Sequence, residues 1–211
     1  MLPEAGARPP EFFANEFRDQ ASLFRLALDD EIVGRLAAYL AELDVWRRRT
    51  NLTGPFDSRE LVSHAMESVL GSQLISHGIR VIDIGSGAGF PGLPLAIARP
   101  DLRVTLLEPR KKRAAFLRHV LQRLPLRNAG VLEKRARALG DAGFDLATVR
   151  AVGDLGSTIG DAGFLKPRGQ IVAWTTDPQG LSRALEPAFS LQSTVPVPGA
   201  DRRVLALLRK R

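Results

Sequence analysis

Hydrophobic positions in the N-terminal third of the chain recur at steps of three and four residues, which places them on one face of a helix. The pattern predicts helices between residues 11 and 78, one starting at Asp29 or Asp30 and another at Asp57 or Ser58. Side chains of these types cap free N–H groups at a helix start. One predicted apolar face consists of Ile32, Leu36, Tyr39, Leu40 and Leu43. Four phenylalanines are expected to fasten the first helices to the body: Phe12, Phe13, Phe17 and Phe24.

From Arg80 onward, short β-branched runs alternate with helical stretches. The predicted strands are Arg80–Ile84, Arg103–Leu107, Ala129–Leu132, Phe144–Val149, Gln170–Trp174, Leu191–Val195 and Arg203–Leu208. The predicted helices are Gly92–Ala98, Lys111–Leu124, Leu155–Leu165 and Leu181–Phe189. This alternation predicts an α/β fold with a seven-stranded, mainly parallel sheet whose last two strands are antiparallel. Residues 1–78 are expected to form a helical extension, flexible over residues 1–10, and residues 79–211 the main domain.

Composition excludes several chemistries. The chain has no cysteine, so it has no disulfide, thiolate metal site or cysteine nucleophile. Its three histidines, His64, His77 and His119, lack the spacing of a metal site, and we expect no metal. The start shows no signal-peptide core and no apolar run has membrane-spanning length, which predicts a cytoplasmic protein.

The formal net charge is +7, with a pI near 10.7. A positive field suits nucleic acid, because neutralised phosphates release counterions. Arg-favouring codon usage explains the same charge, so composition leaves both explanations open.

The segment VIDIGSGAGFPG, residues 81–92, predicts a strand, a glycine-rich turn and a helix start. A dinucleotide-binding loop reads G-x-G-x-x-G, whereas here Gly85, Gly87 and Gly89 alternate and Phe90 follows. With Asp83 before the glycines, the pattern resembles motif I of class I S-adenosylmethionine-dependent methyltransferases. The alternatives are glycines that serve packing only, or NAD bound by a variant loop.

Two acids suit this cofactor. Glu108 ends the second predicted strand, where a carboxylate can accept both ribose hydroxyls. Asp83 ends the first, where it can orient the loop or meet the cationic methionine end directly or through water.

Longer segments resemble a family, the bacterial 16S rRNA guanine-N7 methyltransferases, also called glucose-inhibited division protein B. The residues that carry the resemblance are GFPGLPL at 89–95, WRRRTNLT at 46–53, SHAMESV at 63–69 and TVRA at 148–151. The resemblance runs from about residue 35 to the end. It implies a Rossmann-like class I methyltransferase fold, S-adenosyl-L-methionine as cofactor, and 16S rRNA or the small ribosomal subunit as partner. The simplest expectation for the oligomeric state is a monomer.

The resemblance also implies roles for residues. Gly85 and Phe90 would contact the cofactor, Ala136 and Arg137 would flank its adenine, and Arg150 would face both cofactor and substrate. The basic residues expected to face RNA are Lys112, Arg113 and Arg135.

Three positions depart from the family pattern. Arg137 is basic where an acid is common, which changes adenine or RNA binding only if that side chain makes the contact. Thr175-Thr176 replaces a common Lys-Gly, so the role of that lysine is absent or taken elsewhere. Arg47 replaces an asparagine, expected to be a neutral change on a surface helix.

The implied reaction needs little chemistry from the protein. Guanine N7 has an in-plane lone pair and no proton, so it can attack the methyl group directly. The turn after the fourth strand reads Arg150-Ala151-Val152-Gly153, not the Asp/Asn-Pro-Pro-aromatic turn of amine methylation. We expect positioning and desolvation, without a general base. Rival hypotheses are a methyltransferase for a small molecule or protein, and a non-catalytic basic RNA-binding assembly factor.

Arg110, Lys111, Lys112 and Arg113 fall at a predicted helix start. Cations there oppose the helix dipole at a few tenths of a kcal/mol each, so a phosphate partner is one explanation. A solvated helix end is the other.

We predict that Gly87→Asp abolishes cofactor binding while the protein stays folded, because it adds bulk and an acid beside the methionine end. Isothermal titration with S-adenosylmethionine measures the loss, and circular dichroism checks the fold. Normal affinity in the variant would contradict this placement of the pocket.

Overall fold

The computed structural model describes residues 6–151, 155–159 and 162–211. Its helices are α1 (Pro10–Phe24), α2 (Asp30–Arg47), α3 (Ser58–Gly71), η1 (Ser72–Leu74), α4 (Gly92–Ala98), α5 (Lys111–Arg123), η2 (Ala136–Ala138), α6 (Leu155–Ile159) and α7 (Pro178–Ala184). Its strands are β1 (Arg80–Ile84), β2 (Arg103–Leu107), β3 (Ala129–Leu132), β4 (Phe144–Arg150), β5 (Leu165–Thr175), β6 (Phe189–Pro196) and β7 (Val204–Lys210). No helix in these ranges has the length and apolarity needed to cross a membrane.

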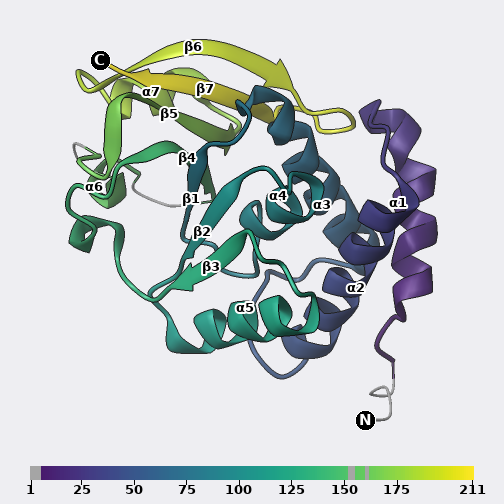
Figure 1. Cartoon of the computed structure of the whole chain (residues 1–211). Helices are drawn as coiled ribbons and strands as arrows, with labels where there is room; N and C mark the ends of the chain where they lie inside the picture. The colour runs from purple at the N-terminus through teal and green to yellow at the C-terminus, as the bar shows by residue number, and fades with distance from the viewer. Residues whose placement is uncertain (1–5, 152–154, 160–161) are drawn as a thin grey trace.

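The seven strands form one sheet in the order β3-β2-β1-β4-β5-β7-β6 (Figure 1). Strands β1 to β5 pair in parallel, and β7 runs antiparallel to both β5 and β6. This confirms the predicted mainly parallel sheet and its antiparallel final pair. The carboxyl ends of β1, β2, β4 and β5 meet at one edge, where ligands bind in open α/β sheets.

The two faces of the sheet carry separate cores. Strand residues alternate between faces: Val81 packs with α1 to α5, whereas Ile82 and Ile84 pack with α6 and the residues after α7. Figure 1 shows α1 to α5 gathered on one side of the sheet. The N-terminal helices therefore share a core with the sheet, and the division at residue 78 stays a prediction.

Helix starts follow their predicted caps. Asp29 accepts a hydrogen bond from the Ile32 N–H at 2.7 Å. Asp57 and Glu60 form a capping box, with N···O distances of 2.8 and 2.6 Å. Phe13, Phe17 and Phe24 are buried between α1 and the helices beside it, as expected. The predicted flexibility of residues 1–10 concerns in part residues 1–5, which lie outside the described ranges.

Three predicted elements are wrong in extent. The helix predicted over Leu155–Leu165 is described over Leu155–Ile159, and β5 already starts at Leu165. That strand contains Pro167 and Gly169 and a register irregularity against β4. Because proline and glycine are uncommon inside strands, the hydrophobic pattern did not predict its first half. The helix predicted over Leu181–Phe189 is Pro178–Ala184, because Asp177 caps it and Phe189 pairs with Lys210 in the sheet.

Two helical glycines should respond to alanine in opposite ways. A Cβ at Gly71 would lie 2.5 Å from Cζ2 of buried Trp174, whereas one at Gly34 meets nothing within 4 Å. We predict that Gly71→Ala lowers the free energy of unfolding by about 1–3 kcal/mol. Gly34→Ala should raise it by about 0.5–1 kcal/mol. Urea denaturation measures both, and effects of the same sign would contradict the packing.

Candidate functional site: a glycine loop between two buried acids

The glycine loop, residues 85–91, bends sharply between β1 and α4. The N–H groups of Gly85 and Ser86 both donate to the Leu107 carbonyl, at 2.9 and 3.0 Å. Gly87 has φ +55° and Gly89 φ +105°, conformations that side chains disfavour. A Cβ at Gly89 would lie 2.4 Å from Leu93 Cδ1, so packing also requires this glycine. At Gly87 the nearest atom, Arg113 Nη1, is 3.6 Å from such a Cβ, which leaves that side of the loop open.

Asp83 is fully buried beneath this loop. Its carboxylate accepts from Thr148 Oγ1 of β4 at 2.9 Å and from the Gly92 N–H of α4 at 3.2 Å. Burial raises its pKa to about 6 from an ordinary 3.8, against the lowering effect of its hydrogen bonds. Of the two roles predicted for Asp83, these contacts match the orientation of the loop.

Glu108 holds the loop from the second strand. One carboxylate oxygen accepts from the Gly87 N–H at 2.9 Å, and the other accepts from the Arg110 N–H at 2.8 Å. The residue is only 2% exposed. Each oxygen keeps a second acceptor position, and the predicted contact with ribose hydroxyls stays a prediction.

Tyr39 is a loop contact that sequence reasoning missed. Its hydroxyl, on α2, donates to the Ala88 carbonyl at 2.8 Å, and its ring meets Phe90 edge-on at 5.6 Å. Burial, followed by the nearby Asp83 charge, raises the Tyr39 pKa well above its usual value. The helical pattern predicted Tyr39 only as a core residue, because its partner is 49 positions away.

A cavity of about 580 Å³, here called the loop cavity, opens beside the glycine loop. Of the predicted site residues, it is lined by Gly85, Gly87, Phe90, Arg113 and Arg150. Arg203 also lines it, and no carboxylate does among the described residues. Three guanidinium groups therefore line one cavity, and the Glu67 carboxylate behind the wall pairs with two of them, Arg150 and Arg203.

The other predicted residues lie elsewhere. Asp83, Gly89 and Glu108 sit behind the loop wall, and Ala136 is buried in η2. The three remaining cations are exposed on the surface: Lys112, Arg135 and Arg137.

Arg150 belongs to a buried charge network that joins the extension to the sheet. Glu67 of α3 pairs with Arg150 of β4 at 2.7 Å and with Arg203 near the start of β7 at 2.5 Å. Burial alone would raise the pKa of Glu67, but its contact with His64 and the two guanidinium charges lower it. Trp174 of β5 donates its indole N–H to the Glu67 carbonyl at 3.1 Å. Removing one partner of such a pair costs about 3–5 kcal/mol.

His64 stands at the junction of α3 with the loop cavity. Its Nδ1 contacts the Arg150 guanidinium, and its ring lies 4.5 Å from the Phe56 ring and 6.0 Å from the Phe90 ring. Burial, more than any other cause, lowers its pKa. These contacts give His64 a packing role at the junction of α3 with the sheet and bring it to the cavity wall.

Arg47 is not the neutral surface residue that its place in the helix predicted. Its guanidinium bonds to Asp44 Oδ1 at 2.6 and 2.8 Å, and Asp44 is fully buried. The Arg8 N–H and Arg48 also bind this carboxylate. Arg47 therefore compensates a buried charge, which its sequence spacing did not reveal.

The predicted basic helix start is present in α5. Arg110 to Arg113 occupy its N-cap and first turn, where there is no acidic residue. None of these four cations pairs with a carboxylate of the described chain. Unneutralised cations at the positive end of a helix favour an anionic partner.

Solved structures share this architecture. A ribosomal protein L11 methylase from Lactobacillus delbrueckii subsp. bulgaricus aligns with a TM-score of 0.58 and 18% identity, over 74% of this chain and 81% of that one. A SAM dependent methyltransferase from Aquifex aeolicus aligns with a TM-score of 0.56 and 16% identity, over 69% of this chain and 89% of that one. At these identities the likeness concerns the fold alone. The fold is that of the Rossmann-like class I S-adenosylmethionine-dependent methyltransferases.

Sequence comparison gives the family within this class. The model of the GidB family, rRNA small subunit methyltransferase G, matches residues 33–181, and the chain belongs to this family. A ribosomal RNA small subunit methyltransferase G of Xanthomonas oryzae pv. oryzae is 38% identical over 87% of this chain and 90% of its own. One of Roseiflexus castenholzii is 43% identical over 66% of this chain, which spans 62% of that relative. The resemblance identified from the motifs is confirmed.

The buried Asp83 predicts an unusual pH dependence of stability. Its folded pKa of about 6 lies above the ordinary 3.8, so unfolding releases a proton between these values and ionisation disfavours the fold. The advantage of wild type over Asp83→Asn should fall by ~2–3 kcal/mol from pH 4 to pH 7. Urea unfolding of both proteins across this range measures it.

Asp101→Asn provides the control of opposite sign. Hydrogen bonding to Arg99 lowers the Asp101 pKa, so its contribution is present above the ordinary carboxyl range and lost on acidification. A flat difference curve for Asp83→Asn would contradict the burial of an ionisable group beneath the loop.

Proposed function

We propose that this protein transfers a methyl group from S-adenosylmethionine to N7 of a guanine in 16S rRNA. Membership of the rRNA small subunit methyltransferase G family supplies the reaction and the RNA. The observation that carries the proposal to this chain is the loop cavity, where a glycine wall faces three guanidinium groups and no carboxylate of the described residues. Such a site suits two anionic groups, the methionine carboxylate of the cofactor and the RNA phosphates.

The glycine loop fits the cofactor. Gly85, Gly87 and Gly89 keep Cβ atoms away from the bend, so a nucleoside can approach the backbone closely. In this proposal, the cofactor contacts Gly85, Gly87, Phe90 and Arg150, while Asp83 and Gly89 hold the loop in shape. Glu108 would reach the ribose, with Ala136 and Arg137 beside the adenine.

The basic residues of α5 and η2 are proposed to meet RNA. Arg113 lines the loop cavity, and Lys112, one position before it in the same helix turn, is exposed. Arg135, exposed before η2, would extend this contact. The cavity also holds Arg203 beside Thr175 and Thr176, where the family commonly has a lysine, and Arg203 is suited to take that role.

The reaction requires orientation rather than proton transfer. S-adenosylmethionine, when bound, supplies an electrophilic methyl group. The N7 lone pair forms the new N–CH₃ bond as the S–CH₃ bond breaks and its electrons stay on sulfur. Because N7 carries no proton, no general base is required and the purine product is cationic. The protein residues then contribute alignment and exclusion of water.

Four further points belong to the same proposal. The protein acts as a monomer in the cytoplasm, and its partner is free 16S rRNA or the small ribosomal subunit. It needs no metal, and the described residues contain no cluster of three or more His, Cys, Asp or Glu suited to hold one.

The direct test is methyl transfer from labelled S-adenosylmethionine to 16S rRNA and to 30S particles lacking the modification. We expect incorporation at one guanine, mapped by strand cleavage at N7-methylguanine. Incorporation should disappear after ribonuclease treatment of the substrate and should decline steeply with salt.

Two outcomes would favour the rivals. Ribonuclease-resistant transfer with little salt dependence would indicate a small-molecule or protein substrate. Tight RNA binding without heat of S-adenosylmethionine binding would indicate a non-catalytic assembly factor.

A further inference from the structure

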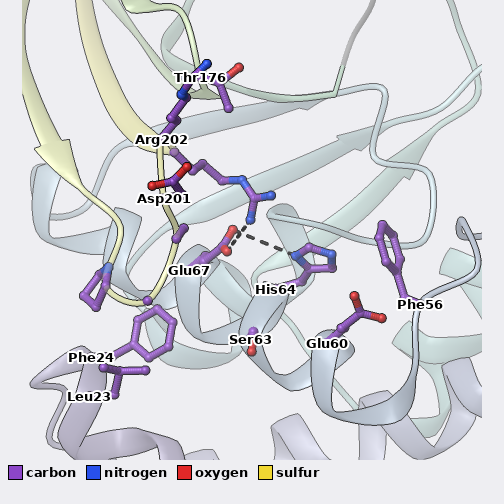
Figure 2. Close-up of a pocket in the computed structure, with 14 residues that line it drawn as sticks. Leu23, Phe24, Phe56, Glu60, Ser63, His64, Glu67, Thr176, Asp201 and Arg202 are labelled. Atoms are coloured by element: carbon purple, nitrogen blue, oxygen red, sulfur yellow. Dashed lines mark hydrogen bonds and ion pairs between the residues drawn. The ribbon is translucent and has the colours of Figure 1, made fainter.

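A second cavity adjoins the loop cavity and is here called the hairpin crevice. It measures about 480 Å³ and lies between the end of α1, the start of α3 and the β6–β7 turn. Figure 2 shows Leu23 and Phe24 on one side of it, Phe56 on the other, and Asp201 and Arg202 above. The two cavities share four lining residues, namely Phe56, His64, Thr176 and Arg203. The crevice therefore continues the site where methyl transfer is proposed.

The crevice collects the large apolar side chains that the fold leaves exposed. Leu23 is 53% exposed and Phe56 36% exposed, and these are the exposed large hydrophobic residues of the described chain. Both line this one crevice, although they belong to different elements. Exposed apolar groups that gather in a concavity indicate a ligand rather than a core.

Phe56 is held rigidly despite its exposure. Its carbonyl accepts from the Arg47 guanidinium, which buried Asp44 anchors. Its N–H donates to the Gly54 carbonyl at 2.8 Å, and its ring contacts the His64 ring near-perpendicularly at 4.5 Å. A fixed and exposed aromatic ring is suited to stack on an unpaired base.

The charges of the crevice favour a base over a phosphate. Glu60, Glu67 and Asp201 line it together with Arg202 and Arg203, and Glu67 is already paired with Arg203. The free carboxylate positions of Glu60 and Asp201 can accept from base N–H groups. The loop cavity, by contrast, is lined by cations, which suit the RNA backbone.

We propose that the hairpin crevice is a subsite for the unstacked base next to the target guanine, with Phe56 as its stacking platform. This inference rests on the proposed function. The base lies between Phe56 and Leu23, and the phosphodiester that links it to the target guanine passes Arg203, which lines both cavities. The site thereby reads two consecutive nucleotides rather than one.

The first test compares Phe56→Ala with Phe56→Trp. The alanine variant should weaken RNA binding and lower kcat/KM for RNA by about 5- to 100-fold at fixed salt, since one base stack is lost. The tryptophan variant should retain both values. Because Phe56 lines both cavities, S-adenosylmethionine affinity is measured separately by calorimetry, and the RNA-affinity loss of the alanine variant should persist at saturating cofactor. Thermal melting checks that each variant is folded.

Pro55→Ala is the matched control, because Pro55 is exposed in the same loop but lines a different cavity. Its RNA affinity should equal that of wild type. Leu23→Asp tests the opposite wall from α1 and should weaken RNA binding without loss of cofactor affinity. Equal RNA affinity in wild type, Phe56→Ala and Leu23→Asp would overturn the subsite.

A double-mutant cycle identifies the occupant. After the methylated guanine is mapped, the nucleotide on its 5′ or 3′ side is replaced by an abasic residue. The replacement on one side should weaken binding to wild type and leave Phe56→Ala unaffected. Additive effects on both sides would refute stacking of the neighbouring base. Absence of methylation by wild type would instead refute the proposed function, so the two failures are distinguishable.

Discussion

The backbone bend after β1 is the constraint on which the rest of the site depends. Two buried carboxylates hold it from below: Asp83 binds the Gly92 N–H at its far end, and Glu108 binds the Gly87 N–H at its middle. The Leu107 carbonyl receives two further N–H groups at its start. These hydrogen bonds fix the course of the glycine loop, and Gly85 and Gly87 leave room for a ligand to approach its backbone from the loop cavity.

The N-terminal helices contribute residues to this site in addition to covering one face of the sheet. Tyr39 of α2 binds the loop carbonyl of Ala88, and Glu67 of α3 sets the two arginines of the cavity. Both contacts cross from the predicted extension to the predicted main domain. The shape of the cofactor loop and the position of the cavity cations thus depend on helices outside the Rossmann-like core.

The basic residues of the protein fall into two sets, one paired with buried carboxylates and one without carboxylate partners in the described chain. The buried carboxylates of Glu67 and Asp44 pair with Arg150, Arg203 and Arg47 and hold these side chains in place. The cations at the start of α5 remain without carboxylate partners in the described chain. The first set gives specificity of shape, whereas the second gives the long-range attraction that RNA binding requires.

The sequence by itself determined the order of the site features along the chain: an acid at the end of a strand, the glycines, the start of a helix, and a second acid at the end of the next strand. These features are local, because alternation, caps and turn residues act within a few positions, so β1, β2, α4 and the start of α5 are predicted at their observed bounds. Tertiary structure decided what local patterns cannot encode. Tyr39, Glu67 and Arg203 acquire their contacts across 49 to 136 positions of chain. Likewise Pro167 and Gly169 fall in a register irregularity of β5, and the strand continues past them because β4 pairs with Leu165 before them and with Gln170 after them.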